Sequence, residues 1–243
     1  MGSLAHPNEH LDGPPSEDLL PPIPPPNKMT GTLEVRWFGP PPFPNELREW
    51  FTTLGTVNTS TQTDLYLPAQ DPTLNVKLRD QQFQIKRRLA EPFRTRFSPR
   101  AAGRCEQWTK WSFDLADDQP SIENRDATHL WVPVEKTRHQ ISIPPEDQAD
   151  LFPNLPNTPA ATIDLELTRL EVNDEHHWTF CLETVGEVPG LADTLQAAGP
   201  TLLDDRLPIP LSDDHSYGYI RWLQQLSSVS TRPAPEVQIP RPE

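Results

Sequence analysis

Basic side chains at alternate positions of predicted strands are the residues of this sequence best placed to do chemistry. Alternate residues of a strand point to opposite faces of its sheet. In residues 74–89, apolar residues alternate with Lys77, Arg79, Lys86 and Arg88, and that polar face holds no acid. Exposed strands also carry bases, so one explanation of this pattern is that the basic face is simply exposed to solvent. A purely cationic face otherwise favours an anionic ligand.

The one-sided pattern recurs in other predicted strands, at residues 31–38, 130–143, 161–172 and 178–185. In the first two strands a base again lies on the polar face, whereas in the last two that face is acidic. The bases inferred in this way are Arg36, Lys77, Arg79, Lys86, Arg88, Lys136 and Arg138, and the acids are Glu34, Asp164, Glu166 and Glu183. If these faces all point inward, they form the ionic lining of one barrel.

The elements that would position these residues indicate an α+β fold. About eight predicted strands follow one another with two or three helices and no βαβ alternation, which favours a mostly antiparallel, closed or nearly closed eight-stranded β-barrel, a tunnel with a few flanking helices. One helix follows residue 186 and is capped by Gly199, and another carries Tyr219 and Trp222. Residues 94–103 are predicted to form a basic loop.

Seven bases inside one barrel would repel one another. Burying unpaired charge costs several kcal/mol per group, so acids, metal, water or a bound polyanion must compensate them. The interior of an eight-stranded barrel has room for side chains or for one small ligand. The expected partner is therefore a small polyanion.

Composition narrows the class further. The formal charge of −14 argues against binding to nucleic acid or to an anionic membrane surface. Prolines are concentrated in residues 1–29 and 227–243, which predicts a disordered arm and tail around one domain at residues 30–226. We expect a cytoplasmic protein, since no long apolar run or signal peptide is present and the two cysteines suit a reducing compartment. A monomer and a homodimer both stay open.

The order of these motifs resembles the CYTH superfamily, the triphosphate tunnel enzymes that include adenylate cyclases and thiamine triphosphatases. Residues 32–36 are similar to the first-strand motif Glu-x-Glu-x-Lys, with Glu34 in the central place, Arg36 for the lysine and Thr32 for the first glutamate. Residues 76–86 resemble the paired basic strands of the family and residues 136–138 its Lys-x-Arg strand. Residues 164–168 and 181–183 are similar to its later acidic strands, and residues 219–223 to a helix near its end.

The resemblance implies metal-assisted cleavage of a phosphoanhydride. Arg36, Lys77, Arg79, Lys86, Lys136 and Arg138 would hold the phosphates, and Arg88 belongs to the same set of candidate ligand-binding bases. Glu34, Glu166 and Glu183 would be catalytic, and with Asp164 they would hold Mg²⁺ or Mn²⁺.

Thr32 leaves an alternative open, because a neutral hydroxyl does not supply the charge of a carboxylate at a metal centre. The alternative is a non-catalytic module that binds a phosphate, polyphosphate or nucleotide. An interaction protein that recruits partners through residues 24–26 is a third hypothesis.

Overall fold

The computed structural model describes residues 25–79, 82–115, 130–152 and 161–230. Most of the predicted arm and tail, residues 1–24 and 231–243, lies outside these ranges. None of the helices in this part of the chain is long and apolar enough to cross a membrane.

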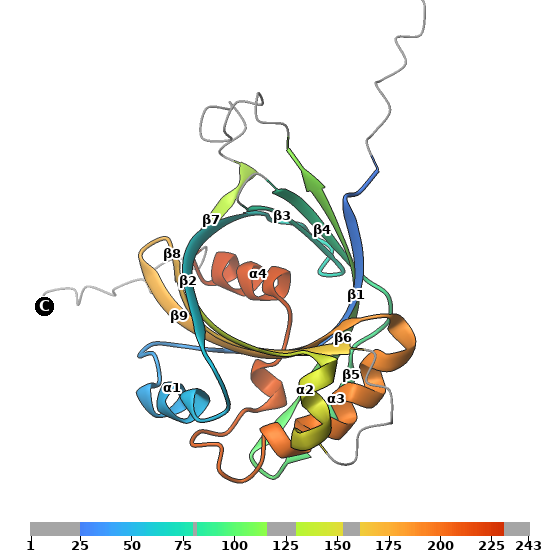
Figure 1. Ribbon diagram of the computed structural model, residues 1–243. Coiled ribbons are helices and arrows are strands. Elements are labelled where there is room, and N and C mark those ends of the chain that lie inside the picture. The colour runs from blue at the N-terminus through green and yellow to red at the C-terminus, as the bar shows by residue number, and fades with distance from the viewer. Residues whose placement is uncertain (1–24, 80–81, 116–129, 153–160, 231–243) are drawn as a thin grey trace, which may run out of the picture.

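Eight antiparallel strands form a closed barrel in the described residues, and a ninth strand extends the sheet (Figure 1). The strands are β1 (Lys28–Gly39), β2 (Asn58–Leu67), β3 (Leu74–Arg79), β4 (Gln82–Arg88), β5 (Phe93–Ser98), β6 (Ala101–Asp114), β7 (Val132–Ile143), β8 (Ala161–Val172) and β9 (Glu175–Gly186). Their order is β1-β9-β8-β7-β2-β3-β4-β6-β5, and pairing of β1 with β6 closes the ring. The predicted α+β class and the eight-stranded barrel are confirmed.

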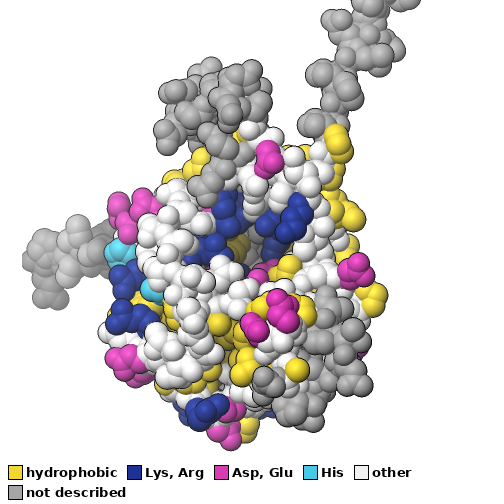
Figure 2. Space-filling view, in the orientation of Figure 1, with side chains coloured by type: hydrophobic (Ala, Val, Ile, Leu, Met, Phe, Trp, Pro, Cys, Tyr) yellow, Lys and Arg dark blue, Asp and Glu magenta, His cyan; other side chains and the backbone are white. Residues whose placement is uncertain are grey.

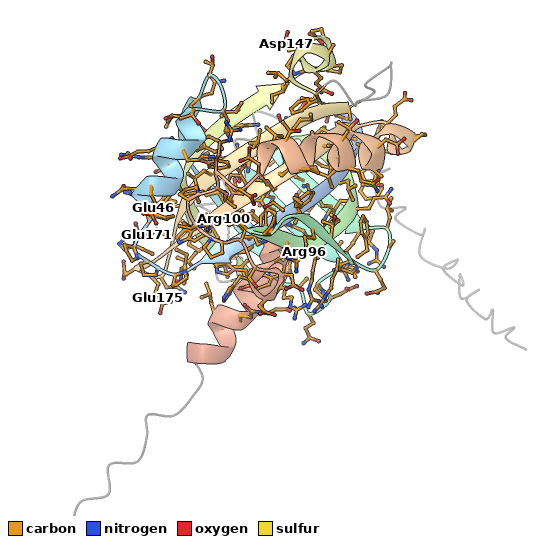
Figure 3. The ribbon with its side chains drawn as sticks, turned by 90° about the horizontal axis from the view of Figure 1, so that it is seen from below. Glu46, Arg96, Arg100, Asp147, Glu171 and Glu175 are labelled. Atoms are coloured by element: carbon orange, nitrogen blue, oxygen red, sulfur yellow. The ribbon has the colours of Figure 1, made fainter. Side chains whose placement is uncertain are left out.

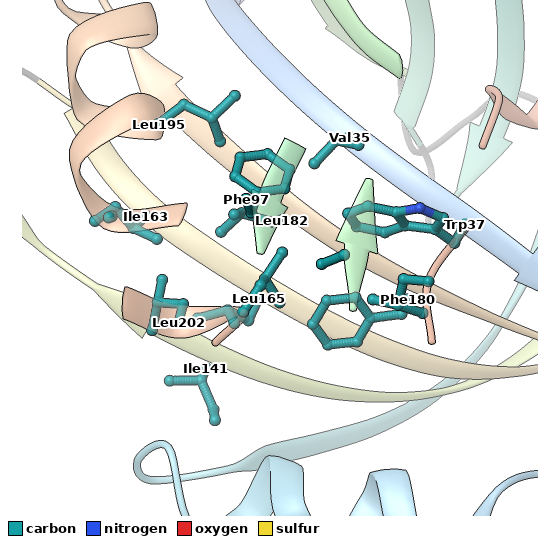
Figure 4. Packing of buried hydrophobic residues seen from close by; sticks show 14 of the residues in the cluster. Val35, Trp37, Phe97, Ile141, Ile163, Leu165, Phe180, Leu182, Leu195 and Leu202 are labelled. Atoms are coloured by element: carbon teal, nitrogen blue, oxygen red, sulfur yellow. The ribbon is translucent and has the colours of Figure 1, made fainter. Parts of the chain in front are cut away.

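Helices lie outside the wall formed by β1, β9 and β8. They are α1 (Asn45–Thr52), α2 (Pro145–Leu151) and α3 (Val188–Leu202). Outward residues of the strands, such as Ile163, Leu165 and Leu182, pack there with Leu195 and Leu202 of α3 in one buried apolar cluster (Figure 4). Because this core is outside the barrel, the inward faces are free to carry charge.

The last helix, α4 (Tyr219–Ser230), lies within the ring of strands in Figure 1 and at one end of the barrel in Figure 3. A short 3-10 helix, η3 (Asp213–His215), precedes it. Tyr219, Ile220 and Trp222 pack with Phe38 of β1 and Val134 of β7 in a second buried cluster. This cluster fills one end of the barrel and leaves the other end for polar side chains.

Residues 94–103 correct one local prediction, because they form β5 and the start of β6 rather than a loop. Phe97 of β5 is buried and belongs to the outer cluster. The predicted cap at Gly199 is also wrong, since α3 continues to Leu202. A Cβ atom at Gly199 would lie 2.3 Å from the Phe97 ring, so the glycine allows close packing of α3 on β5.

Candidate functional site

A cavity of about 240 Å³ occupies the half of the barrel that α4 leaves free. Along β1, alternate residues from Lys28 to Arg36 line it, and the next inward residue, Phe38, belongs to the apolar cluster around α4. On β7, Lys136 lines the cavity and Val134 belongs to that cluster. The cavity is therefore closed by α4 at one end, where Tyr219 forms part of its floor.

Cations outnumber anions in the lining by eight to four, an excess of four positive charges. The cations are Lys28, Arg36, Lys77, Arg79, Lys86, Lys110, Lys136 and Arg138, and the anions are Glu34, Asp164, Glu166 and Glu183. Figure 2 shows Lys and Arg side chains gathered around the hollow at the centre of the molecule. Acidic residues such as Glu46 and Asp147 are exposed on the outside (Figure 3). The molecule thus separates a basic interior from an acidic exterior.

Ten of the eleven charged residues singled out in the sequence line this cavity, as does Thr32. The exception is Arg88, which does not line it and donates a hydrogen bond to Glu106 at 3.1 Å. Burial and the nearby Glu34 raise the pKa of Glu106 to about 7, although Arg88 opposes this shift. Gly218, just before α4, lies close to this pair. A residue with a Cβ atom at this position would bring that atom to 2.8 Å from Glu106 Oε2, so glycine permits the close approach.

Three acids form a row across neighbouring strands on one side of the cavity. Glu34 of β1 lies directly opposite Glu183 of β9, which in turn lies opposite Asp164 of β8. Lys86 Nζ from β4 reaches across to Glu34 Oε2 at 3.2 Å and to Glu183 Oε1 at 3.1 Å. Burial would lower the pKa of Lys86, yet Glu183 and Glu34 raise it above its ordinary value. One ammonium group therefore bridges two opposed carboxylates and compensates part of their charge.

Glu166 of β8 binds two arginines, Arg36 of β1 and Arg138 of β7. Its Oε1 accepts a hydrogen bond from Arg36 NH1 at 2.9 Å, and its Oε2 lies 2.7 Å from Arg138 NH2. Burial would raise the pKa of Glu166, but Arg36 and Arg138 hold it well below its ordinary value. Glu166 is thus an ionised carboxylate whose two oxygens are both committed.

A metal centre is not preformed by these acids. Oxygen ligands suit Mg²⁺ and Mn²⁺, but Glu34 and Glu183 share Lys86, Glu166 binds two arginines, and Asp164 accepts a hydrogen bond from Ser142 at 2.5 Å. Among the described residues, no three His, Cys, Asp or Glu side chains are placed to hold one ion. The predicted ligands are engaged in ion pairs and hydrogen bonds, so metal binding would require them to rearrange.

The residues of the site that the sequence interpretation missed include Lys28, Asp64, Lys110 and Tyr219. Lys110 and Ser112, which also lines the cavity, lie two residues apart on one face of β6, so alternation within residues 106–115 held the signal. Lys28 is part of β1, which begins before the strand that was predicted. Asp64 is an isolated acid in a polar strand, and only the fold reveals the bases around it.

The described residues form an eight-stranded antiparallel β-barrel, extended by β5, with a charged cavity that is closed at one end. No family model and no curated protein matches it. Among solved structures, it is similar to a conserved hypothetical protein from Pyrococcus furiosus, with 14% sequence identity and a TM-score of 0.41 over 77% of this chain and 98% of that chain. A likeness at this level carries no argument about function.

Proposed function

We propose that the barrel binds a small phosphate polyanion, with inorganic triphosphate as the first candidate, in the manner of the CYTH superfamily that the sequence resembles. The observation that supports this proposal best is the excess of positive charge at the cavity, where eight lining cations face four lining anions and the buried Asp64. Cations confined in a low-dielectric interior repel one another, and a bound polyanion relieves that repulsion. Because these cations lie inside the barrel of an acidic protein, the ligand must be small enough to enter the cavity.

The size of the cavity favours an inorganic ligand over a nucleotide. Its volume of about 240 Å³ is below the range of roughly 300–1,000 Å³ that is usual for drug-sized ligands. An organic group attached to the phosphates would have to remain at the open end, since α4 and the apolar cluster close the other. The phosphates then enter first, toward Arg36, Lys136 and Tyr219.

Hydrolysis of the same ligand is the second candidate function, and the row of Glu34, Glu183 and Asp164 is the observation that favours it. These carboxylates are engaged with Lys86 and Ser142, so a reaction that depends on them requires their rearrangement when the ligand binds. Binding is therefore our main proposal.

Isothermal titration of the full chain with inorganic triphosphate, with and without Mg²⁺ or Mn²⁺, tests both functions when released phosphate is assayed in the same samples. Arg138→Leu removes an arginine that lines the cavity. Arg87→Leu is the matched control, because it removes an exposed arginine on the outer face of β4. We expect binding by the wild-type protein and by Arg87→Leu, and weaker binding by Arg138→Leu. Absence of binding by the wild-type protein contradicts the proposal, and metal-dependent release of phosphate establishes the second function.

A further inference from the structure

Asp64 of β2 is a fully buried carboxylate surrounded by three cations of the cavity wall. Arg79 binds it with two parallel hydrogen bonds, from Nε to Oδ1 at 2.6 Å and from NH2 to Oδ2 at 2.7 Å. Lys136 Nζ lies 2.8 Å and Lys77 Nζ 3.0 Å from Oδ2. Gln62 Nε2 donates a further hydrogen bond to Oδ1 at 2.9 Å. A single acid thus joins bases from β3 and β7.

The three bases line the cavity, whereas Asp64 itself does not. It therefore lies behind them, away from the space that a ligand occupies. An arginine has five N–H donors and a lysine has three, so these contacts leave donors free on each base. The NH1 group of Arg79 is not used by Asp64. The bases can consequently bind Asp64 and a ligand at the same time.

We propose that Asp64 is a positioning residue for anion binding, an internal counter-ion that holds Lys77, Arg79 and Lys136 together as one clamp. The inference rests on the proposed function of the cavity. Without Asp64 the three like charges would separate, and the three flexible side chains would lose rotamer freedom on binding a ligand. Asp64 fixes them before the ligand arrives, as preorganised sites require.

Asp64 also favours the charged form of the two lysines. Burial lowers the pKa of Lys136 to about 8, with Asp64 opposing the shift, Arg79 adding to it and Glu166 of β8 opposing it. Burial and Arg79 likewise lower the pKa of Lys77, again against Asp64. The other groups that face Lys136 are Tyr66 of β2, whose hydroxyl it contacts at 2.8 Å, and Tyr219 of α4, whose ring centre is 3.9 Å away. Without Asp64, both lysines would lose their protons at lower pH.

A charge argument alone predicts the opposite effect of removing Asp64. A carboxylate near the site repels an anion, so its neutralisation would strengthen binding if Asp64 contributed only charge. If Asp64 positions the clamp, its neutralisation weakens binding although the cavity becomes more positive. At a pH low enough for Lys77 and Lys136 to stay protonated without Asp64, the sign of the change therefore distinguishes the two roles.

The test is titration of the full-length Asp64→Asn variant with inorganic triphosphate without metal, between about pH 6 and pH 9. Asp71→Asn is the matched control. It removes an exposed acid that pairs with Arg87 and lies between β2 and β3. We expect the affinity of Asp64→Asn to fall by about tenfold at about pH 6, the acid end of the range, the size of effect that loss of a hydrogen bond to a charged group produces. We also expect its pH profile to shift to lower pH and Asp71→Asn to bind like the wild-type protein.

Equal or tighter binding by Asp64→Asn overturns the inference, while failure of the wild-type protein to bind overturns the proposed function itself. If Asp64→Asn does not fold, Gln62→Leu decides, because Gln62 contacts Asp64, is neutral and does not line the cavity. Loosening Asp64 in this way should weaken binding by about threefold, less than loss of the carboxylate itself, because Gln62 acts on the bases only through Asp64. Unchanged binding by a folded Gln62→Leu protein then counts against a positioning role.

Discussion

Lys86 of β4 and Lys110 of β6 lie directly opposite each other across a strand pair, although both are cations. Like charges in this position destabilise a sheet. Lys86 is neutralised by Glu34 and Glu183, but Lys110 makes no ion pair with any residue that the structure describes. The repulsion is therefore only partly relieved in the protein alone, and Lys110 supplies positive charge that a ligand can use.

We expect Lys110→Met to stabilise the protein and weaken its ligand binding at the same time. Removal of the opposed charge should raise the free energy of unfolding by up to about 1 kcal/mol, and the loss of an unpaired cation should lower the affinity for triphosphate. Urea unfolding and calorimetric titration measure the two effects. Arg87→Met, on the outer face of β4, should change neither by much, and a Lys110→Met protein that is less stable but binds equally well would contradict this account.

Ligand binding should take up protons as the pH rises through about 8. Burial is the main cause that lowers the pKa of both Lys110 and Lys136 to about 8. In the free protein these lysines are charged below that pH and increasingly neutral above it. An anion favours the charged form, so its affinity should fall between about pH 7 and pH 9.

Titrations in two buffers with different heats of ionisation measure the proton uptake. Comparison of the wild-type protein with Lys110→Met at each pH removes the titration of the ligand itself. The variant should take up fewer protons, and identical uptake by both proteins would show that Lys110 does not titrate on binding.

Alternation of residue types made most of the fold and the site predictable. The inward faces of β1, β3, β7, β8 and β9 were inferred correctly because one side of each strand is consistently charged. In β5 the same alternation of Phe93, Thr95 and Phe97 with arginines was present, but its bases and irregular pattern suggested a loop. Packing of Phe97 against α3, which the local sequence does not encode, makes that segment a strand.

The pairing of charges could not be predicted in the same way. Alternation shows which face a residue occupies, but distances across a barrel depend on the stagger of its strands. Glu166 was predicted to hold metal and instead contacts Arg36 and Arg138, which come from strands far apart in the sequence. Asp64 was not singled out, because its three partners belong to two other strands. The metal-binding role thus stays a prediction.

Lys86 should control whether the carboxylates can hold a metal ion. Its ammonium group lies between Glu34 and Glu183, two directly opposed acids. Lys86→Met leaves these acids facing each other, and a divalent cation with oxygen ligands can then replace the lost charge. We expect Lys86→Met to bind Mn²⁺ at least about tenfold more tightly than the wild-type protein, a difference of about 1.4 kcal/mol.

Calorimetric titration with Mn²⁺ measures this gain. Addition of Glu183→Gln to Lys86→Met should abolish it, while Glu171→Gln, an exposed acid on β8, should leave it intact. Equal Mn²⁺ affinity of Lys86→Met and the wild-type protein would mean that this pair of acids is not a latent metal site.

Replacement of Gly199 by alanine tests how closely α3 packs on β5. We expect this change to destabilise the protein, although helix propensity alone predicts the opposite. Alanine in place of glycine inside a helix normally stabilises by about 1 kcal/mol. In α3, however, the new Cβ would lie 2.3 Å from the buried Phe97 ring of β5. Phe97 also contacts Trp37, with ring centroids 6.4 Å apart, so it has little freedom to move. Overpacking of this kind costs about 1–3 kcal/mol, which exceeds the gain in propensity.

We therefore expect Gly199→Ala to lower the free energy of unfolding, measured by urea denaturation. Gln196→Ala, on the exposed side of the same helix, should have almost no effect. Gly199→Ala combined with Phe97→Leu should regain part of the loss, because the smaller side chain leaves room for the methyl group. If Gly199→Ala is instead more stable than the wild-type protein, α3 does not pack on β5 as closely as the glycine implies. In that case β5 would be held mainly by its hydrogen bonds to β6.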